Sequence, residues 1–172
     1  MQNLQHWTDY LNAHDLQVVT AESCTAGLVA AKLGAIPGCG DWLDCSYVTY
    51  SPQAKNRILG VRFDTIERCN LTSEAVAREM AEGALQASPA NVAISNTGVA
   101  GPGPGEGGIP VGTVCFGWAF RHDGQVRVFT ETRHFDGDRN AVREAAADHA
   151  IARIPALHAQ LLAGQPERGG AA

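Results

Sequence analysis

A serine stands where a predicted strand gives way to a predicted helix. Ser23 follows the β-branched run 18–20 and precedes a helical pattern over 24–35. Backbone N–H groups at a helix start are unpaired and partly positive, so they can stabilise an oxyanion beside a nucleophile. Two other interpretations stay open: Ser23 only caps the helix, or Cys24 is the nucleophile. No histidine lies near Cys24 in the sequence to activate its thiol.

A tyrosine and a lysine form a second candidate group. Tyr50 ends a predicted strand over 44–50, and Lys55 lies in the first turn of a helix predicted to begin at Ser51-Pro52 and to run through Ile58. A lysine acts as a base only when it is neutral, which requires burial or neighbouring positive charge, and a nearby tyrosine can relay the proton. The alternative is a surface lysine beside a packed tyrosine. The spacing matches neither Tyr-x-x-x-Lys nor Ser-x-x-Lys.

A glycine-rich loop over 98–108 could bring backbone N–H groups close to a phosphate. Its Gly-x-Gly-x-x-Gly at 103–108 leads into a strand rather than a helix, so it does not predict a dinucleotide site. The alternative is a flexible connection. Arg139 and Arg143 lie one helical turn apart, and both could reach one phosphate or carboxylate, unless they form an ordinary solvated helix face.

Hydrophobic periodicity and turn residues give the elements that must position these groups. Further helices are predicted over 3–14, from Thr72 or Ser73 to about 86, and from Asp138 onward, with a kink or break at Pro155. Further strands are predicted over 91–95, 111–120 and 125–134, the last two joined by a hairpin at Asp123-Gly124. The alternation predicts an α/β protein, a three-layer α/β/α sandwich whose mixed sheet includes a late antiparallel hairpin. The order of the strands does not follow from these patterns.

Length and composition limit the class of protein. The 172 residues suit one domain, predicted over 1–165, with a disordered tail over 166–172. A net charge of −5 argues against a broad nucleic-acid-binding face. There is no signal-peptide pattern and no apolar run near the ~20 residues that cross a bilayer, so we expect a cytoplasmic protein without a membrane partner. Five cysteines without a C-x-x-C pair suggest reduced thiols, and the six histidines show no zinc spacing.

Several short motifs, taken together and in order, carry a family resemblance. They are T-A-E-S-C-T-A-G at 20–27, Val48-Thr49-Tyr50-Ser51 with Lys55, Leu59-Gly60-Val61, the run 73–84, Thr97-Gly98-Val99-Ala100-Gly101-Pro102, Pro110-Val111-Gly112 and Gly137-Asp138-Arg139. Over roughly residues 4–162 the chain resembles the CinA C-terminal domain family, in its stand-alone form. The enzymatic members of that family are nicotinamide-nucleotide amidases.

The resemblance implies hydrolysis of the carboxamide of nicotinamide mononucleotide to nicotinic acid mononucleotide and ammonia, with no metal or organic cofactor. The family's catalytic serine, tyrosine and lysine fall on Ser23, Tyr50 and Lys55. The residues expected to bind the nucleotide are Thr25, Thr97, Gly98, Gly101, Gly103 and Arg139. A homodimer is also expected from the family.

These expectations combine into a mechanism in which neutral Lys55, with Tyr50 in the proton path, takes the proton of Ser23, and Ser23 attacks the amide. The family usually has two glycines after Ser-Cys-Thr, and here Ala26 replaces the first. That alanine is unfavourable if the position needs a positive φ and favourable if it is ordinary helix. The alternatives are a nucleotide-binding or regulatory module without turnover and an amidase for another small pyridine amide.

Overall fold

The structure is a computed structural model that describes residues 2–164, so the predicted tail over 166–172 lies outside the described residues. A five-stranded sheet in the order β2-β1-β3-β4-β5 forms the centre. Its strands are β1 (Val18–Glu22), β2 (Leu43–Val48), β3 (Val92–Gly98), β4 (Thr113–His122) and β5 (Gln125–His134). The first three are parallel, and β3, β4 and β5 are antiparallel, which confirms the mixed sheet with a late hairpin.

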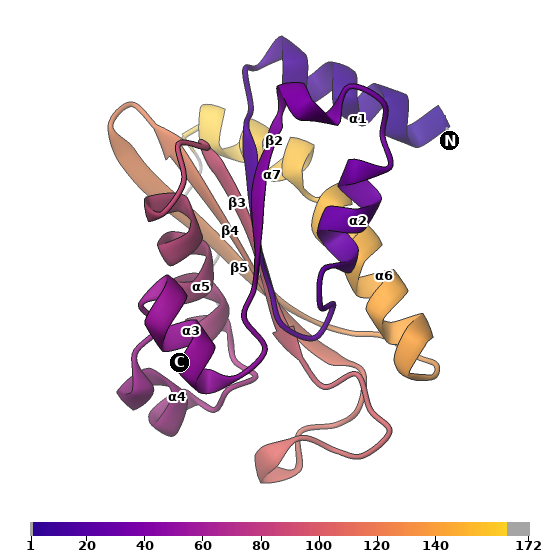
Figure 1. Cartoon of the computed structure of the whole chain (residues 1–172), viewed down its shortest axis with the longest axis vertical. Helices are drawn as coiled ribbons and strands as arrows, with labels where there is room; N and C mark the ends of the chain where they lie inside the picture. Colours follow the sequence, from indigo (N-terminus) through magenta and orange to yellow (C-terminus); the bar gives the residue numbers. More distant parts are fainter. Residues whose placement is uncertain (1, 165–172) are drawn as a thin grey trace.

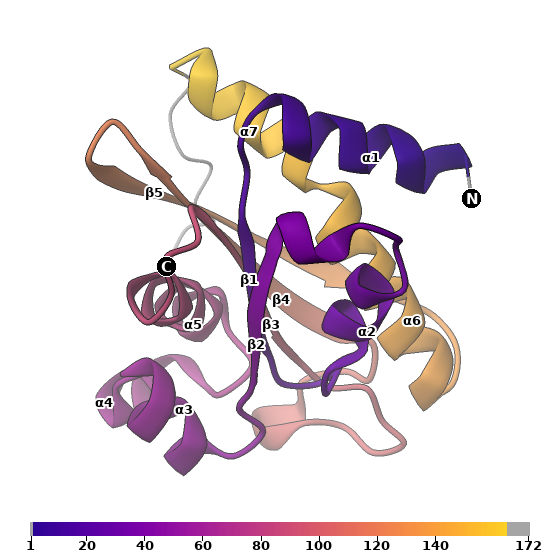
Figure 2. The same cartoon turned by 45° about the horizontal axis from the view of Figure 1, so that its top comes forward.

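Helices cover both faces of the sheet (Figure 1). One face carries α1 (Gln2–Ala13), α2 (Leu28–Gly34), α6 (Arg139–Ala152) and α7 (Ile154–Leu162), and the other carries α3 (Pro52–Leu59), α4 (Phe63–Cys69) and α5 (Glu74–Gln86). Figure 2 shows α1 and α7 side by side above the first face. Because alternate strand residues point to opposite faces, β3 divides its side chains between two cores: Ile94 packs under α2 and α6, and Ala93 packs under α5. None of the helices within residues 2–164 is both long and apolar enough to cross a bilayer.

Several predicted boundaries hold because local chemistry sets them. Asp123 and Gly124 both have positive φ at the hairpin, as a two-residue turn of this kind requires. Asp138 caps α6 by accepting from two backbone amides, and Pro155 in the first turn of α7 separates α7 from α6. Ser51 caps α3, with Pro52 as its first residue.

Other predictions were wrong at the ends of elements or missed an element. The helix predicted over 24–35 begins only at Leu28, because Ala26 and Gly27 have positive φ and form a turn instead. Of the residues expected to give this helix its apolar surface, Leu33 is buried and Leu28 packs against the core, but Ala31 is exposed and Val29 is buried in its place. Strand β2 ends at Val48, before Tyr50, because the carbonyls of Thr49 and Tyr50 accept from Lys55 rather than from a neighbouring strand. The short helix α4 was not predicted.

Helix α3, which carries Lys55, lies close against α5 because of one glycine. A Cβ built on Gly83 of α5 would overlap the carbonyl oxygen of Leu59 at the end of α3. Only a residue without a side chain lets the two helices approach this closely, so Gly83 helps to set how near α3 lies to the sheet.

We therefore expect Gly83→Ala to destabilise the protein by about 2–3 kcal/mol, because the added methyl group meets backbone that cannot rotate away. Gly34→Ala is the matched control, since a Cβ at that helical position has nothing within 4 Å. It should leave stability unchanged or raise it by up to about 1 kcal/mol. Urea unfolding of both variants measures the difference, and equal midpoints would show that the α3–α5 contact tolerates a methyl group.

Candidate active site

The serine and the lysine singled out in the sequence meet at the carboxyl ends of β1 and β2. The Nζ of Lys55 donates to the Oγ of Ser23 at 2.8 Å. It also donates to the carbonyls of Thr49 at 2.6 Å and of Tyr50 at 3.1 Å. The Lys55 side chain is fully buried, so it is not the surface lysine of the alternative interpretation. A buried amine is thus held against a hydroxyl at the sheet edge where α/β proteins form their sites.

Burial makes this amine easier to deprotonate. It lowers the pKa of Lys55 from 10.5 to about 8, because the charged ammonium loses its hydration. Burial also raises the pKa of the neighbouring Cys24 thiol to about 12, so this thiol is protonated and unreactive near neutral pH. The pair of Ser23 and Lys55 therefore has a better basis as nucleophile and base than Cys24 does.

Glu22 occupies the position at the start of α2 where an anion could bind. Its carboxylate is fully buried and accepts from the backbone amides of Gly27, Val29 and Ala30 at 2.8–3.1 Å. Ser23 therefore does not cap α2, and Gly27, its N-cap residue, makes no side-chain cap. The helix amides expected to stabilise an oxyanion are already bonded to an internal carboxylate. Among residues 2–164, no other residue accepts from the backbone N–H of Cys24, which leaves it available beside Ser23.

Asn96 at the end of β3 fixes the turn that carries Ser23. Its backbone carbonyl accepts from the Ser23 amide at 3.1 Å. The Thr25 hydroxyl donates to Glu22 at 2.6 Å and lies 3.0 Å from the side-chain oxygen of Asn96, which also accepts from the Thr25 amide at 3.4 Å. Thr25 is fully buried in this network. Its expected role in binding substrate stays a prediction, and its side chain helps to hold the turn.

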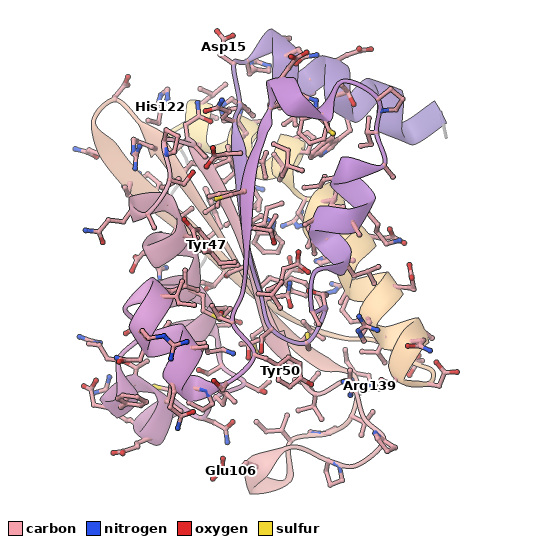
Figure 3. The ribbon with its side chains drawn as sticks, in the orientation of Figure 1. Asp15, Tyr47, Tyr50, Glu106, His122 and Arg139 are labelled. Atoms are coloured by element: carbon pink, nitrogen blue, oxygen red, sulfur yellow. The ribbon has the colours of Figure 1, made fainter. Side chains whose placement is uncertain are left out.

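Tyr50 and Arg139 lie together at the mouth of the site, above the loop that contains Glu106 (Figure 3). Arg139 donates to the Tyr50 hydroxyl at 3.1 Å and to the Gly101 carbonyl at 2.7 Å. Tyr50 is 55% exposed, and only its backbone carbonyl contacts Lys55. The hydrogen-bond chain between Ser23 and Lys55 therefore does not include the Tyr50 hydroxyl.

A pocket of about 260 Å³ opens beside the nucleophile turn, just below the roughly 300 Å³ at which small-molecule sites begin. Its lining residues are Cys24, Tyr50, Asn70, Leu71, Thr72, Gly98, Val99, Ala100, Gly101, Gly103, Gly105, Glu106 and Arg139. The predicted Gly98, Gly101 and Gly103 are among them. Thr97 is not, because its side chain is buried and donates to the Leu71 carbonyl.

A larger hollow of about 490 Å³ lies over α3, α4 and α5. Its lining includes Arg62 and Glu79, which form an ion pair. It contains none of the predicted site residues, whereas the smaller pocket is lined by Tyr50 and Arg139 and by Cys24 next to Ser23, so size alone does not mark the site. No cluster of three or more potential metal-binding side chains occurs within residues 2–164.

Comparison with known proteins supports the family that the motifs suggest. The profile of the CinA C-terminal domain matches residues 2–157. The chain belongs to the CinA C-terminal domain family. It is 48% identical over 137 residues to the nicotinamide-nucleotide amidohydrolase PncC of Enterobacter agglomerans, covering 80% of this chain and 82% of that protein. It is 49% identical over 123 residues to a CinA-like protein of Chlorobium phaeobacteroides, covering 71% of this chain but only 29% of that longer protein.

A solved structure of the family has the same fold. The competence damage-inducible protein A of Klebsiella pneumoniae aligns with a TM-score of 0.85 and 37% identity, over 92% of this chain and 96% of that one. This agreement confirms the three-layer α/β/α architecture for this member of the CinA C-terminal domain family.

The sequence analysis did not identify Glu22 and Asn96 as residues that hold the Ser23 turn. It considered Arg143 only as a second arginine that could bind an anion. Glu22 carried a signal, since a carboxylate ending a buried β-branched strand must find donors inside the fold. Asn96 carried no comparable signal, because its role depends on the register that sets it beside Glu22 in the sheet.

We expect Glu22→Gln to destabilise the protein by about 3 kcal/mol or more, although the two side chains have the same shape. Both carboxylate oxygens accept from backbone amides, so either orientation of the glutamine sets an N–H₂ donor against another donor. Glu144→Gln, at a side chain 55% exposed, is the control and should change stability by less than about 0.5 kcal/mol. Urea midpoints that fall equally in both variants would contradict the role of Glu22.

Proposed function

We propose that this protein hydrolyses the carboxamide of nicotinamide mononucleotide, releasing ammonia and nicotinic acid mononucleotide. The observation that carries the proposal is the 2.8 Å contact between the Oγ of Ser23 and the Nζ of Lys55. The name of the Enterobacter agglomerans relative, which the chain matches over most of its length, supports the choice of substrate.

Counting protons at Lys55 supports the direction of proton transfer. Three acceptors surround Nζ, and the two carbonyls of Thr49 and Tyr50 can only accept. A neutral amine keeps two N–H bonds, which these carbonyls take, and its lone pair is then directed at the third neighbour, the Ser23 hydroxyl. Deprotonation of Lys55 thus converts it from a donor to Ser23 into an acceptor of the Ser23 proton.

In the proposed reaction Ser23 attacks the amide carbon while Lys55 takes its proton. The Cys24 backbone N–H stabilises the oxyanion, a kind of interaction worth about 3–4 kcal/mol per donor in a studied case. The ammonium of Lys55 then returns the proton to the leaving nitrogen, and ammonia departs. Water, deprotonated by the same amine, hydrolyses the acyl-enzyme. No step needs a metal or an organic cofactor.

Arg139 and Tyr50 are proposed to bind the nucleotide rather than to move the proton. Two donors of the Arg139 guanidinium are used by Gly101 and Tyr50, so three N–H donors remain for a phosphate at the pocket mouth. The strand end at Gly98 and the loop residues Gly101 and Gly103 are proposed to line the remainder of the nucleotide site.

Removing either half of the proposed pair should abolish turnover. We expect Ser23→Ala and Lys55→Met each to lower ammonia release from nicotinamide mononucleotide by about a thousandfold or more, since the two residues act as a unit. Lys32→Met removes the only other lysine, which pairs with Glu144 and Asp148 on the surface, and should keep the wild-type rate. Full activity of Ser23→Ala would rule out an acyl-enzyme.

A steady-state assay also separates the other possible functions. A module that binds the nucleotide without turnover would show calorimetric binding and no ammonia. An amidase for another pyridine amide would favour free nicotinamide over the mononucleotide, because contacts with the phosphate act only on substrates that carry one.

The rate should follow the deprotonation of Lys55. Because burial lowers the pKa of Lys55 to about 8 and the neutral amine is the base, kcat/KM should rise about tenfold per pH unit below 8 and level off above it. Measuring kcat/KM from pH 6 to 9.5 checks this. A rate that is flat over this range, or one that falls as the pH rises, would show that neutral Lys55 is not the base.

A further inference from the structure

Arg143 contacts the nucleophile turn rather than the pocket. It lies on α6, one turn beyond Arg139, and reaches across to residues 24 and 25. Its Nε donates to the Cys24 carbonyl at 3.2 Å, and its Nη2 donates to the Thr25 carbonyl at 2.8 Å. One planar guanidinium thus fixes two successive peptide groups next to Ser23, a geometry that a lysine ammonium cannot reproduce. Of the two arginines, only Arg139 lines the pocket.

The turn held in this way is strained. Ala26 has a φ of 51°, in the left-handed region that an alanine rarely adopts. A residue keeps such a conformation only where the surroundings impose it. Here the restraints come from opposite sides: Asn96 on β3 accepts from the Thr25 amide and hydroxyl, and Arg143 on α6 binds the two carbonyls.

We propose that Arg143 is a positioning residue for Ser23 and that Ala26 makes this chain especially dependent on it. The inference rests on the proposed function. Without the guanidinium, the carbonyls of Cys24 and Thr25 lose their charge-assisted hydrogen bonds, and Ala26 relaxes toward negative φ. That rotation displaces the peptide groups that carry the Cys24 N–H and the Ser23 side chain.

Because Arg143 and residue 26 both affect the shape of the same turn, the effect of changing one should depend on the other. A glycine at 26 adopts the left-handed conformation without steric cost, so the turn keeps its shape with fewer restraints. Arg143 should therefore matter more when residue 26 is alanine than when it is glycine. An arginine that merely ties α6 to α2 would matter equally in both backgrounds.

The test is a double-mutant cycle of Arg143→Ala and Ala26→Gly, with ammonia release from nicotinamide mononucleotide as the readout. We expect Arg143→Ala to lower kcat by about ten- to a hundredfold, because a misplacement of about 1 Å can cost that much, with KM changed by less than about twofold. In the Ala26→Gly background, the fold-decrease in kcat caused by Arg143→Ala should be less than about a third of the fold-decrease that it causes when residue 26 is alanine. Arg143→Lys should fall between wild type and Arg143→Ala.

Glu144→Ala is the matched control on the same helix. It removes an ion pair between α6 and Lys32 of α2 without touching residues 23–26, and it should leave kcat unchanged. Equal losses from Arg143→Ala in both backgrounds would overturn the proposal, and so would a rise in KM at constant kcat or a loss in Glu144→Ala as large as that in Arg143→Ala.

A second readout does not depend on the proposed function. If the wild-type protein releases no ammonia, the proposed function fails, and urea unfolding of the same four proteins still tests the contact. If the change in urea midpoint caused by Arg143→Ala depends on whether residue 26 is alanine or glycine, the proposed restraint on the turn is supported. Strictly additive changes in the midpoint overturn the proposal.

Discussion

The site depends on keeping a lysine amine out of water without giving it an anion to pair with. The Lys55 side chain is fully buried, and among residues 2–164 its Nζ contacts two carbonyls and one hydroxyl but no carboxylate. A carboxylate partner would offset the loss of hydration and hold the amine in its charged form. Because the hydrogen-bond partners are neutral, burial has the largest effect on its protonation, and the pKa of Lys55 falls to about 8. The lowered pKa of Lys55, on which its proposed role as a base depends, is thus a product of the fold.

The fold provides this environment through a few local features. Ser51 and Pro52 begin α3 directly after β2, which turns Lys55 back over the carbonyls at the strand end. Gly83 lets α3, the helix that carries the buried Lys55, lie close against α5. On the other face of the sheet, Glu22 and Asn96 hold the turn that brings Ser23 to the same edge. Ser23 and Lys55 therefore come from connections that leave β1 and β2 toward opposite faces of the sheet.

The sequence allowed the α/β class, the mixed sheet and the pair of Ser23 and Lys55 to be predicted, because these follow from periodicity, turn chemistry and short motifs. It did not allow the shape of the Ser23 turn to be predicted. The pattern over 24–35 is helical, but the helix begins only at Leu28 because Ala26 and Gly27 have positive φ, and Glu22 binds the first amides of the helix there. That contact depends on where β1 ends in three dimensions. The contacts of the Tyr50 phenol could not be predicted either: its position in the sequence suggests a place near Lys55, whereas its hydroxyl accepts from Arg139.

The position of Glu22 also changes where a developing negative charge can be stabilised. A helix N-terminus pointing at a nucleophile ordinarily supplies the oxyanion site. Here the α2 terminus is neutralised internally, and a second anion close to the Glu22 carboxylate would be repelled rather than held. The available donor is the Cys24 amide, one residue from the nucleophile and outside the helix. The direction of the Cys24 N–H is set by the conformation of the turn. A change in the backbone angles of the strained Ala26 would therefore move both Ser23 and this N–H. The end of α2 thus serves to fix the turn. The turn presents Ser23 and the Cys24 amide, the two groups proposed to act on a substrate.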